Sequence, residues 1–144
     1  MRRHDARAGF TLIEIMVVMM IIGLLAMIVG PRFIRQGEKA QAQAARIQIE
    51  QLGMALDTFR LEVGRYPNTQ EGLAALRQRP FGVDRWDGPY LPKDVPRDPW
   101  DRPYQYRSPG EAGRPYDLVS LGADGSPGGE SDNRDILSWE GDRG

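Results

Sequence analysis

The chain has 144 residues, 27% of them charged, and a formal net charge of −1 at pH 7. This balance lacks the basic surface with which proteins bind nucleic acid, so nucleic acid is not expected as a partner. The absence of cysteine excludes a disulfide framework and a cysteine-linked lipid anchor. The only histidine, His4, precedes an apolar run, so the rest of the chain offers no histidine for catalysis or for zinc.

The first element is the apolar run from Phe10 to Val29, which reads FTLIEIMVVMMIIGLLAMIV. A helix of this length crosses the roughly 30 Å hydrocarbon core of a bilayer. The basic residues ahead of it predict a cytoplasmic N-terminus; they are Arg2, Arg3 and Arg7. Glu14 is the one ionisable residue of the run, where an acid costs about 2.5–3.5 kcal/mol. Glu14 therefore either serves assembly or is a tolerated acid near the end of a plain signal anchor.

Helical periodicity continues from Pro31 to Val63. Six apolar residues follow one another there at spacings of three or four, which predicts a narrow stripe that packs on a small globular domain. Gly64 is a natural helix stop, and Pro31, which lacks an N–H, favours a kink. The stripe consists of Ala45, Ile49, Leu52, Leu56, Phe59 and Val63.

A second apolar row lies on nearly the opposite side of the same helix. Ile47, Met54 and Leu61 repeat every seven residues. The row is either a set of scattered surface hydrophobes, which are common, or a contact with a neighbouring subunit.

Asn68 and Glu71 have the spacing of a capping box, in which two side chains cap each other's backbone N–H groups. The spacing predicts a short helix from about Thr69 to Gln78. This helix should turn two leucines inward, Leu73 and Leu76.

The remainder predicts an ordered loop followed by strands. The loop runs from Phe81 to Pro103 and has aromatic anchors that argue against disorder. Runs of β-forming residues bounded by turn residues then predict three antiparallel strands, with a hairpin connection at Pro109 to Arg114. The fold class is therefore α+β, with the sheet packed on the helical stripe. The expected strands are Tyr104 to Arg107, Tyr116 to Leu121 and Ile136 to Trp139.

The N-terminal pattern resembles the signal of type IV pilins and pseudopilins. A short charged leader ends in Gly9, Phe10 opens the apolar run, Glu14 stands four residues later and Pro31 stands at the family's kink position. The resemblance implies that a prepilin peptidase cuts after Gly9 and methylates the new amine of Phe10. The apolar segment is then kept as membrane anchor and later as filament core. In a bundle of such helices, Glu14 can pair with the amine of a neighbouring subunit.

Five further stretches narrow the resemblance to the major pseudopilins of the type II secretion system. It implies a structural subunit without catalysis, in a periplasmic filament that helps export folded proteins across the outer membrane. The implied partners are further copies of the chain, minor pseudopilins, the inner-membrane assembly platform and, before assembly, membrane lipid. Asp101 departs from the family, which often has glycine there. The stretches are Gly64 to Pro67, Gln70 to Leu76, Asp98 to Tyr104, Tyr116 to Leu118, and Leu121 to Gly125.

The resemblance divides the chain into a leader at 1–9, a transmembrane and filament-core helix at 10–30, an amphipathic half-helix at 31–64 and a periplasmic globular domain at 65–144. It also implies a single-pass protein of the bacterial inner membrane. Two other functions compete with this one. A pilin for a type IV pilus or DNA uptake predicts a disulfide loop or a basic surface, and the sequence has neither. A membrane-anchored enzyme would need two carboxylates across a cleft, such as Asp124 and Asp132.

The segment from Leu121 to Ile136 reads LGADGSPGGESDNRDI and is rich in glycine and acid. If it folds back on itself, carboxylates and backbone carbonyls converge as hard oxygen ligands, which suit Ca²⁺. Without histidine or cysteine, zinc and copper fit poorly. The segment is therefore either a calcium site or a solvated cluster of acidic turns. Its acidic residues are Asp124, Glu130, Asp132 and Asp135.

The resemblance implies the calcium site, because the major pseudopilins bind a calcium ion in this loop. Asp124 and the carbonyl of Leu121 match the family's ligands. We favour Asp132 as the next acidic ligand, with the shell completed by Ser131, Asn133 or Asp135. Bound calcium would stabilise the folded state by mass action.

Overall fold

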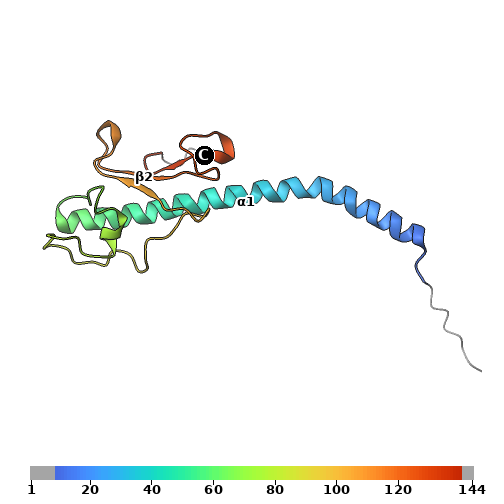
Figure 1. The fold of residues 1–144 in the computed structure, drawn as a ribbon, viewed down its shortest axis with the longest axis horizontal. Coiled ribbons are helices and arrows are strands. Elements are labelled where there is room, and N and C mark those ends of the chain that lie inside the picture. Colours follow the sequence, from blue (N-terminus) through green and yellow to red (C-terminus); the bar gives the residue numbers. More distant parts are fainter. Residues whose placement is uncertain (1–8, 141–144) are drawn as a thin grey trace, which may run out of the picture. The chain divides into compact units, whose positions relative to one another are not determined.

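The computed structural model describes residues 9–140, without the side chains of residues 30–35 and of Asp132. Its longest element is helix α1, Leu12–Val63. The chain divides into two compact units, one ending at Gly37 and the other spanning Glu38–Gly144. Helix α1 contributes its first half to one unit and its second half to the other (Figure 1). The expected long N-terminal helix is thus confirmed.

The first unit contains the apolar half of α1. Leu12–Val29 has a mean hydropathy of 2.9, and none of this segment is buried. By length and composition it is a helix that could cross a membrane. The helical backbone continues through Pro31, and a kink at that residue stays a prediction.

The second unit is built on the predicted stripe of α1. Ala45, Leu56 and Phe59 are completely buried, and Ile49 and Leu52 nearly so. Ala55, which the periodicity did not select, is buried beside them. These side chains form one core with residues from the later elements, which are Leu73, Ala75, Leu76, Tyr104, Leu118 and Ile136. The packing of the stripe on the globular domain is therefore confirmed.

Three short strands form one antiparallel sheet in the order β1-β2-β3. The strands are β1 Gln105–Arg107, β2 Asp117–Ser120 and β3 Ile136–Leu137. Val119 lies opposite Gln105 on one side and Leu137 on the other. The inward-facing residues are the alternating set, Leu118 and Ser120 on β2 and Ile136 on β3.

Each strand is shorter than the sequence predicted. Pro103 and Pro115 lack an N–H for a ladder, so Tyr104 and Tyr116 fall outside the strands that follow them. After β3 the chain turns, but the N–H of Ser138 still donates to the carbonyl of Leu118 at 2.9 Å. Sheet pairing thus extends a little beyond the regular strands.

The prediction of a short helix from about Thr69 to Gln78 is wrong in both helix type and length. The capping box itself is present, because Asn68 Oδ1 and Glu71 Oε2 each accept the other residue's N–H at 2.8 Å. Gly72 then adopts φ 58°, which an α-helix does not allow. Only the 3₁₀ turn η1, Leu73–Leu76, remains, and both of its leucines are buried as expected.

The segment between η1 and β1 is irregular but tied to the core. Trp86 Nε1 donates to the carbonyl of Ala75, and the N–H of Tyr90 donates to the carbonyl of Leu76, both at 2.8 Å. Figure 1 shows this yellow-green segment and the sheet on different sides of α1. The prediction of an ordered loop held by aromatic residues is confirmed for this stretch.

Candidate functional site

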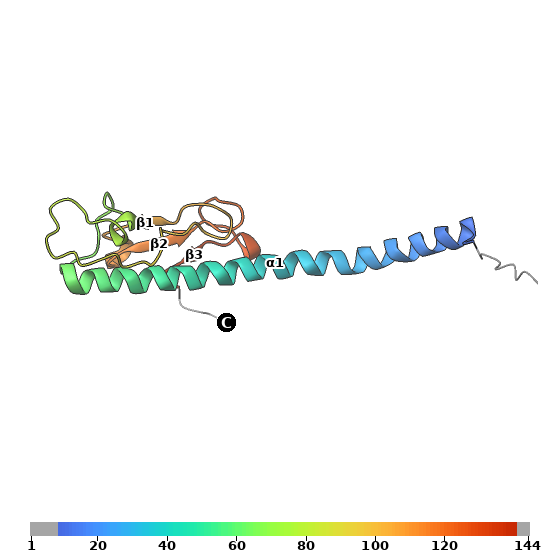
Figure 2. The ribbon, with the colours of Figure 1, turned by 90° about the horizontal axis from the view of Figure 1, so that it is seen from below.

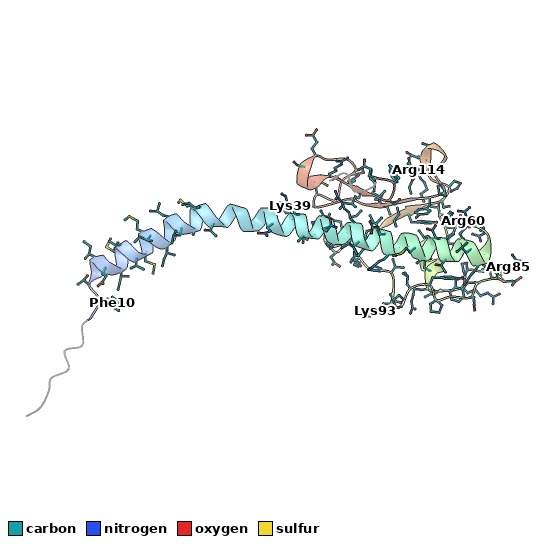
Figure 3. All side chains as sticks on the ribbon, turned by 180° about the vertical axis from the view of Figure 1, so that it is seen from behind. Phe10, Lys39, Arg60, Arg85, Lys93 and Arg114 are labelled. Carbon is teal, nitrogen blue, oxygen red and sulfur yellow. The ribbon has the colours of Figure 1, made fainter. Side chains whose placement is uncertain are left out.

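The expected cleavage junction lies directly ahead of helix α1. Gly9 and Phe10 are exposed and non-helical, and the helix begins at Leu12. Figure 3 shows Phe10 at this end of the helix. The junction is therefore exposed, non-helical chain that another protein can reach.

Glu14 has a local partner that sequence reasoning missed. The N–H of Glu14 donates to Thr11 Oγ1 at 3.3 Å, and the N–H of Thr11 donates to Glu14 Oε2 at 3.4 Å. These two bonds form a capping box at the start of α1. The T-x-x-E spacing is visible in the sequence, but the apolar run around Glu14 favours only an assembly residue or a tolerated acid of the anchor.

The glycine-rich loop after β2 folds back on itself, as expected. The carbonyl of Leu121 accepts the N–H of Gly125 at 3.2 Å, and Asp124 Oδ1 accepts the N–H of Ser126 at 3.0 Å. Asp124 itself is exposed. Four glycines of the loop have positive φ, a conformation that side chains disfavour; they are Gly122, Gly125, Gly128 and Gly129.

Asp135 joins the two ends of this loop. Its Oδ2 accepts the N–H of Gly128 at 2.8 Å, and its own N–H donates to the carbonyl of Gly128 at 3.3 Å. Its Oδ1 is buried and has no hydrogen-bond partner among the described residues. An orphaned carboxylate oxygen of this kind calls for a donor or a cation, because an unpaired buried acceptor is costly.

The donor set of the loop suits an oxygen-seeking cation. Its candidate ligand groups are carboxylates, hydroxyls, the Asn133 amide oxygen and backbone carbonyls. The buried Oδ1 of Asp135 has no partner within the described part of the chain. In the described part of the chain, however, no three acidic side chains stand close enough to hold a metal. The side chain of Asp132 lies outside the described residues, and Ser131 begins the 3₁₀ turn η3, Ser131–Asn133. The full ligand set stays a prediction.

A buried network that sequence reasoning missed connects this loop to the segment before β1. Asp98 is buried and accepts three hydrogen bonds, from the N–H groups of Trp100 and Arg102 and from Ser120 Oγ. The Arg102 guanidinium in turn donates to the carbonyls of Gly122 and Ala123, at 2.7 and 3.1 Å. Asp98 and Arg102 belong to a stretch that carried the family resemblance, but their chemistry could not be assigned without the fold.

The same segment explains the departure at Asp101. Its φ is 62°, in the left-handed region where glycine is favoured and where aspartate is one of the better tolerated alternatives. The N–H of Asp101 donates to the carbonyl of Asp98 at 2.9 Å, which closes the turn. The glycine that the resemblance leads us to expect at this position and the aspartate present here would thus meet the same backbone requirement.

A second buried acid, Asp117, is fully paired. Its carboxylate accepts hydrogen bonds from Arg114 Nε at 2.6 Å, from Arg107 Nη2 at 2.8 Å and from the N–H of Glu111 at 2.9 Å. The bond from Arg114, followed by those from Arg107 and Glu111, holds the pKa of Asp117 well below its usual range. Asp117 thus fixes the β1–β2 connection, which contains the 3₁₀ turn η2, Glu111–Gly113, and it stays ionised.

Two known protein-family models match this chain. Residues 5–30 match the prokaryotic N-terminal methylation motif. Residues 32–139 match the family of type II secretion system protein G. The chain belongs to the type II secretion system protein G family. The resemblance inferred from the sequence motifs is therefore confirmed, and so is the expectation of a structural, non-enzymatic protein.

Relatives of the protein G family match over nearly their whole length. The type II secretion system core protein G of Pseudomonas aeruginosa is 44% identical over 93% of this chain and 96% of the relative. The protein of the same name from Vibrio cholerae is 42% identical over 96% of both chains. The two lengths correspond, so the match is not limited to the N-terminal segment that other pilin-like proteins share.

A solved structure confirms the fold. The crystal structure of the major pseudopilin from the type 2 secretion system of enterohaemorrhagic Escherichia coli matches with a TM-score of 0.59 and 36% identity. The match covers 72% of this chain and 90% of that one. The pilin-like α+β fold predicted from the sequence is thus confirmed, whereas the calcium loop is not tested by this likeness.

Proposed function

We propose that this chain is the major structural subunit of a type II secretion pseudopilus. The observation that carries the proposal is that the chain matches protein G over nearly its whole length. The chain also has an unburied helix long enough to cross a membrane. An apolar segment of this size needs lipid or other copies of the chain to cover it. In the membrane it serves as a single-pass anchor with a cytoplasmic N-terminus, and in the filament it forms the core.

Assembly begins with processing at the Gly9–Phe10 junction. A prepilin peptidase removes residues 1–9 and methylates the amine of Phe10; the exposed, non-helical junction supports this step. Glu14, one helical turn beyond Phe10, then pairs with the amine of a neighbouring subunit. The partners that follow are the inner-membrane assembly platform, minor pseudopilins and further copies of the chain.

Mass spectrometry tests the processing step. Full-length chain expressed with a prepilin peptidase should yield a mature N-terminus at N-methylated Phe10. Gly9→Leu should leave the leader attached, whereas Glu14→Gln should still be cut. Cleavage of wild type at another bond, or equal cleavage of Gly9→Leu, would count against this assignment.

We also propose that the loop after β2 binds one structural Ca²⁺ ion. The ligands are the carbonyl of Leu121 and the side chain of Asp124, with Asp132, Ser131 and Asp135 completing the shell. The orphaned Oδ1 of Asp135 and the all-oxygen donor set support the site. The ion stabilises the folded loop, because it binds the folded chain and not the unfolded one.

Thermal unfolding in detergent, with EDTA and then with excess Ca²⁺, tests the metal site. A site with a free-ion concentration 100 times its Kd adds about 2.7 kcal/mol of stability. Wild type should therefore melt several degrees higher in calcium, and Asp124→Ala should lose this response. Asp94→Ala is the control, because Asp94 has an almost fully exposed side chain outside the loop. Identical wild-type curves in EDTA and calcium would remove the calcium proposal and leave the filament proposal standing.

A further inference from the structure

Phe81 lies exposed on a hydrogen-bonded turn of the second unit. The N–H of Val83 donates to the carbonyl of Pro80 at 3.3 Å, and Gly82 has φ 75°, the geometry of a type II β-turn with Phe81 at its first corner. Val83 anchors the turn in the protein interior, and Phe81 is 105% exposed. The aromatic ring thus contacts nothing else in the described chain.

The side chain of Arg79 binds the backbone of this turn and the side chain of the residue that follows it. Its Nε donates to the carbonyl of Val83 at 2.7 Å, and its Nη2 pairs with Asp84 at 3.1 Å. The backbone that presents Phe81 is therefore already ordered. A large apolar side chain on an ordered support loses little conformational freedom when a partner covers it, which is the property of an interface anchor.

The second apolar row of α1 is also uncovered. Ile47, Met54 and Leu61 are 47%, 63% and 84% exposed. In the view of Figure 2, the sheet and the loops lie on one side of this half of α1. The exposed fractions show that these segments leave the row uncovered. Successive members stand about 10.5 Å apart along the helix, at 1.5 Å per residue. That spacing leaves room for one aromatic ring between two neighbours.

A charged residue stands beside each of the two features, and the two charges have opposite signs. Glu50 is exposed and lies on α1 between Ile47 and Met54. Arg85 follows the Phe81 turn, is exposed, and forms no hydrogen bond or ion pair with the described residues. Figure 3 shows Arg85 near the C-terminal end of α1. A negative charge thus flanks the row, and a positive charge flanks the projecting ring.

We infer that Phe81 of one copy inserts beside Met54 in the row of the next copy, with Arg85 facing Glu50. This inference rests on the proposed function as a filament subunit. The ring and the row lie on different parts of the same molecule, so their contact is heterologous. Such contacts build an open filament when the rotation between copies does not close a ring. In an open filament each added copy again offers a free ring or a free row, whereas face-to-face pairing of two rows would stop at a dimer.

Crosslinking in assembled filaments tests the contact. The chain has no cysteine, so crosslinks can form only at the cysteines that are introduced. Full-length Met54→Cys and Phe81→Cys chains, co-expressed with the secretion-system assembly components, should give a mixed dimer with a short bismaleimide. A chain that carries both substitutions should give a ladder of multiples. Lys93→Cys, an exposed position elsewhere in the same loop segment, replaces Phe81→Cys as the control and should not crosslink to Met54→Cys.

The outcomes separate this contact from the proposed function. Filaments that yield no more Met54–Phe81 product than the Lys93 control overturn the contact and leave the filament proposal standing. Crosslinking mainly between two Phe81→Cys chains also overturns it, because that contact would be symmetric. Failure of the wild-type chain to form any filament overturns the proposed function, and this inference with it.

A charge exchange gives a second, independent readout. Glu50→Arg should reduce the yield of filaments pelleted from cells, and adding Arg85→Glu in the same chain should restore it. Phe81→Asp should reduce the yield about tenfold or more, as expected for an interface anchor. Unchanged yields for Phe81→Asp and Glu50→Arg would overturn the contact.

Discussion

Asp117 shows how one residue can make the free energy of unfolding depend on pH. Its buried carboxylate accepts two guanidinium donors and one backbone N–H. Asp117→Asn leaves these donors with a weaker acceptor and should lower the free energy of unfolding at pH 7 by about 1–3 kcal/mol. Urea unfolding in detergent measures the loss. Asp94→Asn, at an exposed side chain, is the control and should change little.

The pKa of Asp117 gives the sign of the pH effect. Because its folded-state pKa lies below the usual value near 4, its stabilisation is present above about pH 4 and is lost as the pH falls further. Wild type should therefore lose more stability between about pH 5 and pH 3 than Asp117→Asn does. Equal losses in the two proteins would show that Asp117 does not carry the effect.

At the scale of single residues, the sequence predicts a hydrogen-bonded pair only when both partners are close along the chain. The Asn68–Glu71 capping box was predicted and is present. The Thr11–Glu14 box has the same spacing and was missed, because the apolar surroundings of Glu14 directed attention to the anchor and to subunit assembly. The hydrogen bond from Ser120 to Asp98 spans 22 residues, and nothing in the sequence pairs them.

Among the elements, α1 carries two apolar faces with opposite consequences for stability. Phe59 is completely buried against the sheet and loops, so Phe59→Ala should cost about 3–5 kcal/mol through lost transfer energy and a cavity. Leu61, two residues later, is 84% exposed, and Leu61→Ala should stay within about 0.5 kcal/mol. Urea unfolding of the detergent-solubilised chain compares them. Similar losses would show that the helix packs with another face.

Element types were predictable where periodicity was long. The α1 stripe extends over five turns and left no ambiguity about the buried face. The segment after Asn68 is too short for that, and the positive φ of Gly72 converts an expected helix into the 3₁₀ turn η1. Strand lengths depend on which N–H groups find partners across the sheet, so β3 is two residues long where four were expected.

For the molecule as a whole, the two units have opposite relations to solvent. The second has its own core, drawn from α1, η1 and the sheet. The first exposes the apolar side chains of Leu12–Val29 without any cover. A chain of this kind reaches a stable state only when lipid or further copies surround that segment. This is the physical reason why the apolar half of α1 belongs to anchoring and assembly.

The division of the chain predicts that the second unit folds without the first. Among the residues that the structure describes, every buried member of the hydrophobic core lies at Ala45 or later, so a chain beginning at Glu38 keeps this core. It should unfold cooperatively on heating, with native near-UV circular dichroism, and should not join filaments. Phe59→Ala in the same shortened chain is the control and should melt at a lower temperature. Gradual, non-cooperative melting of the shortened chain would mean that the apolar half of α1 also stabilises the globular unit. In that case anchoring and folding could not be separated, because loss of the membrane segment would destroy both.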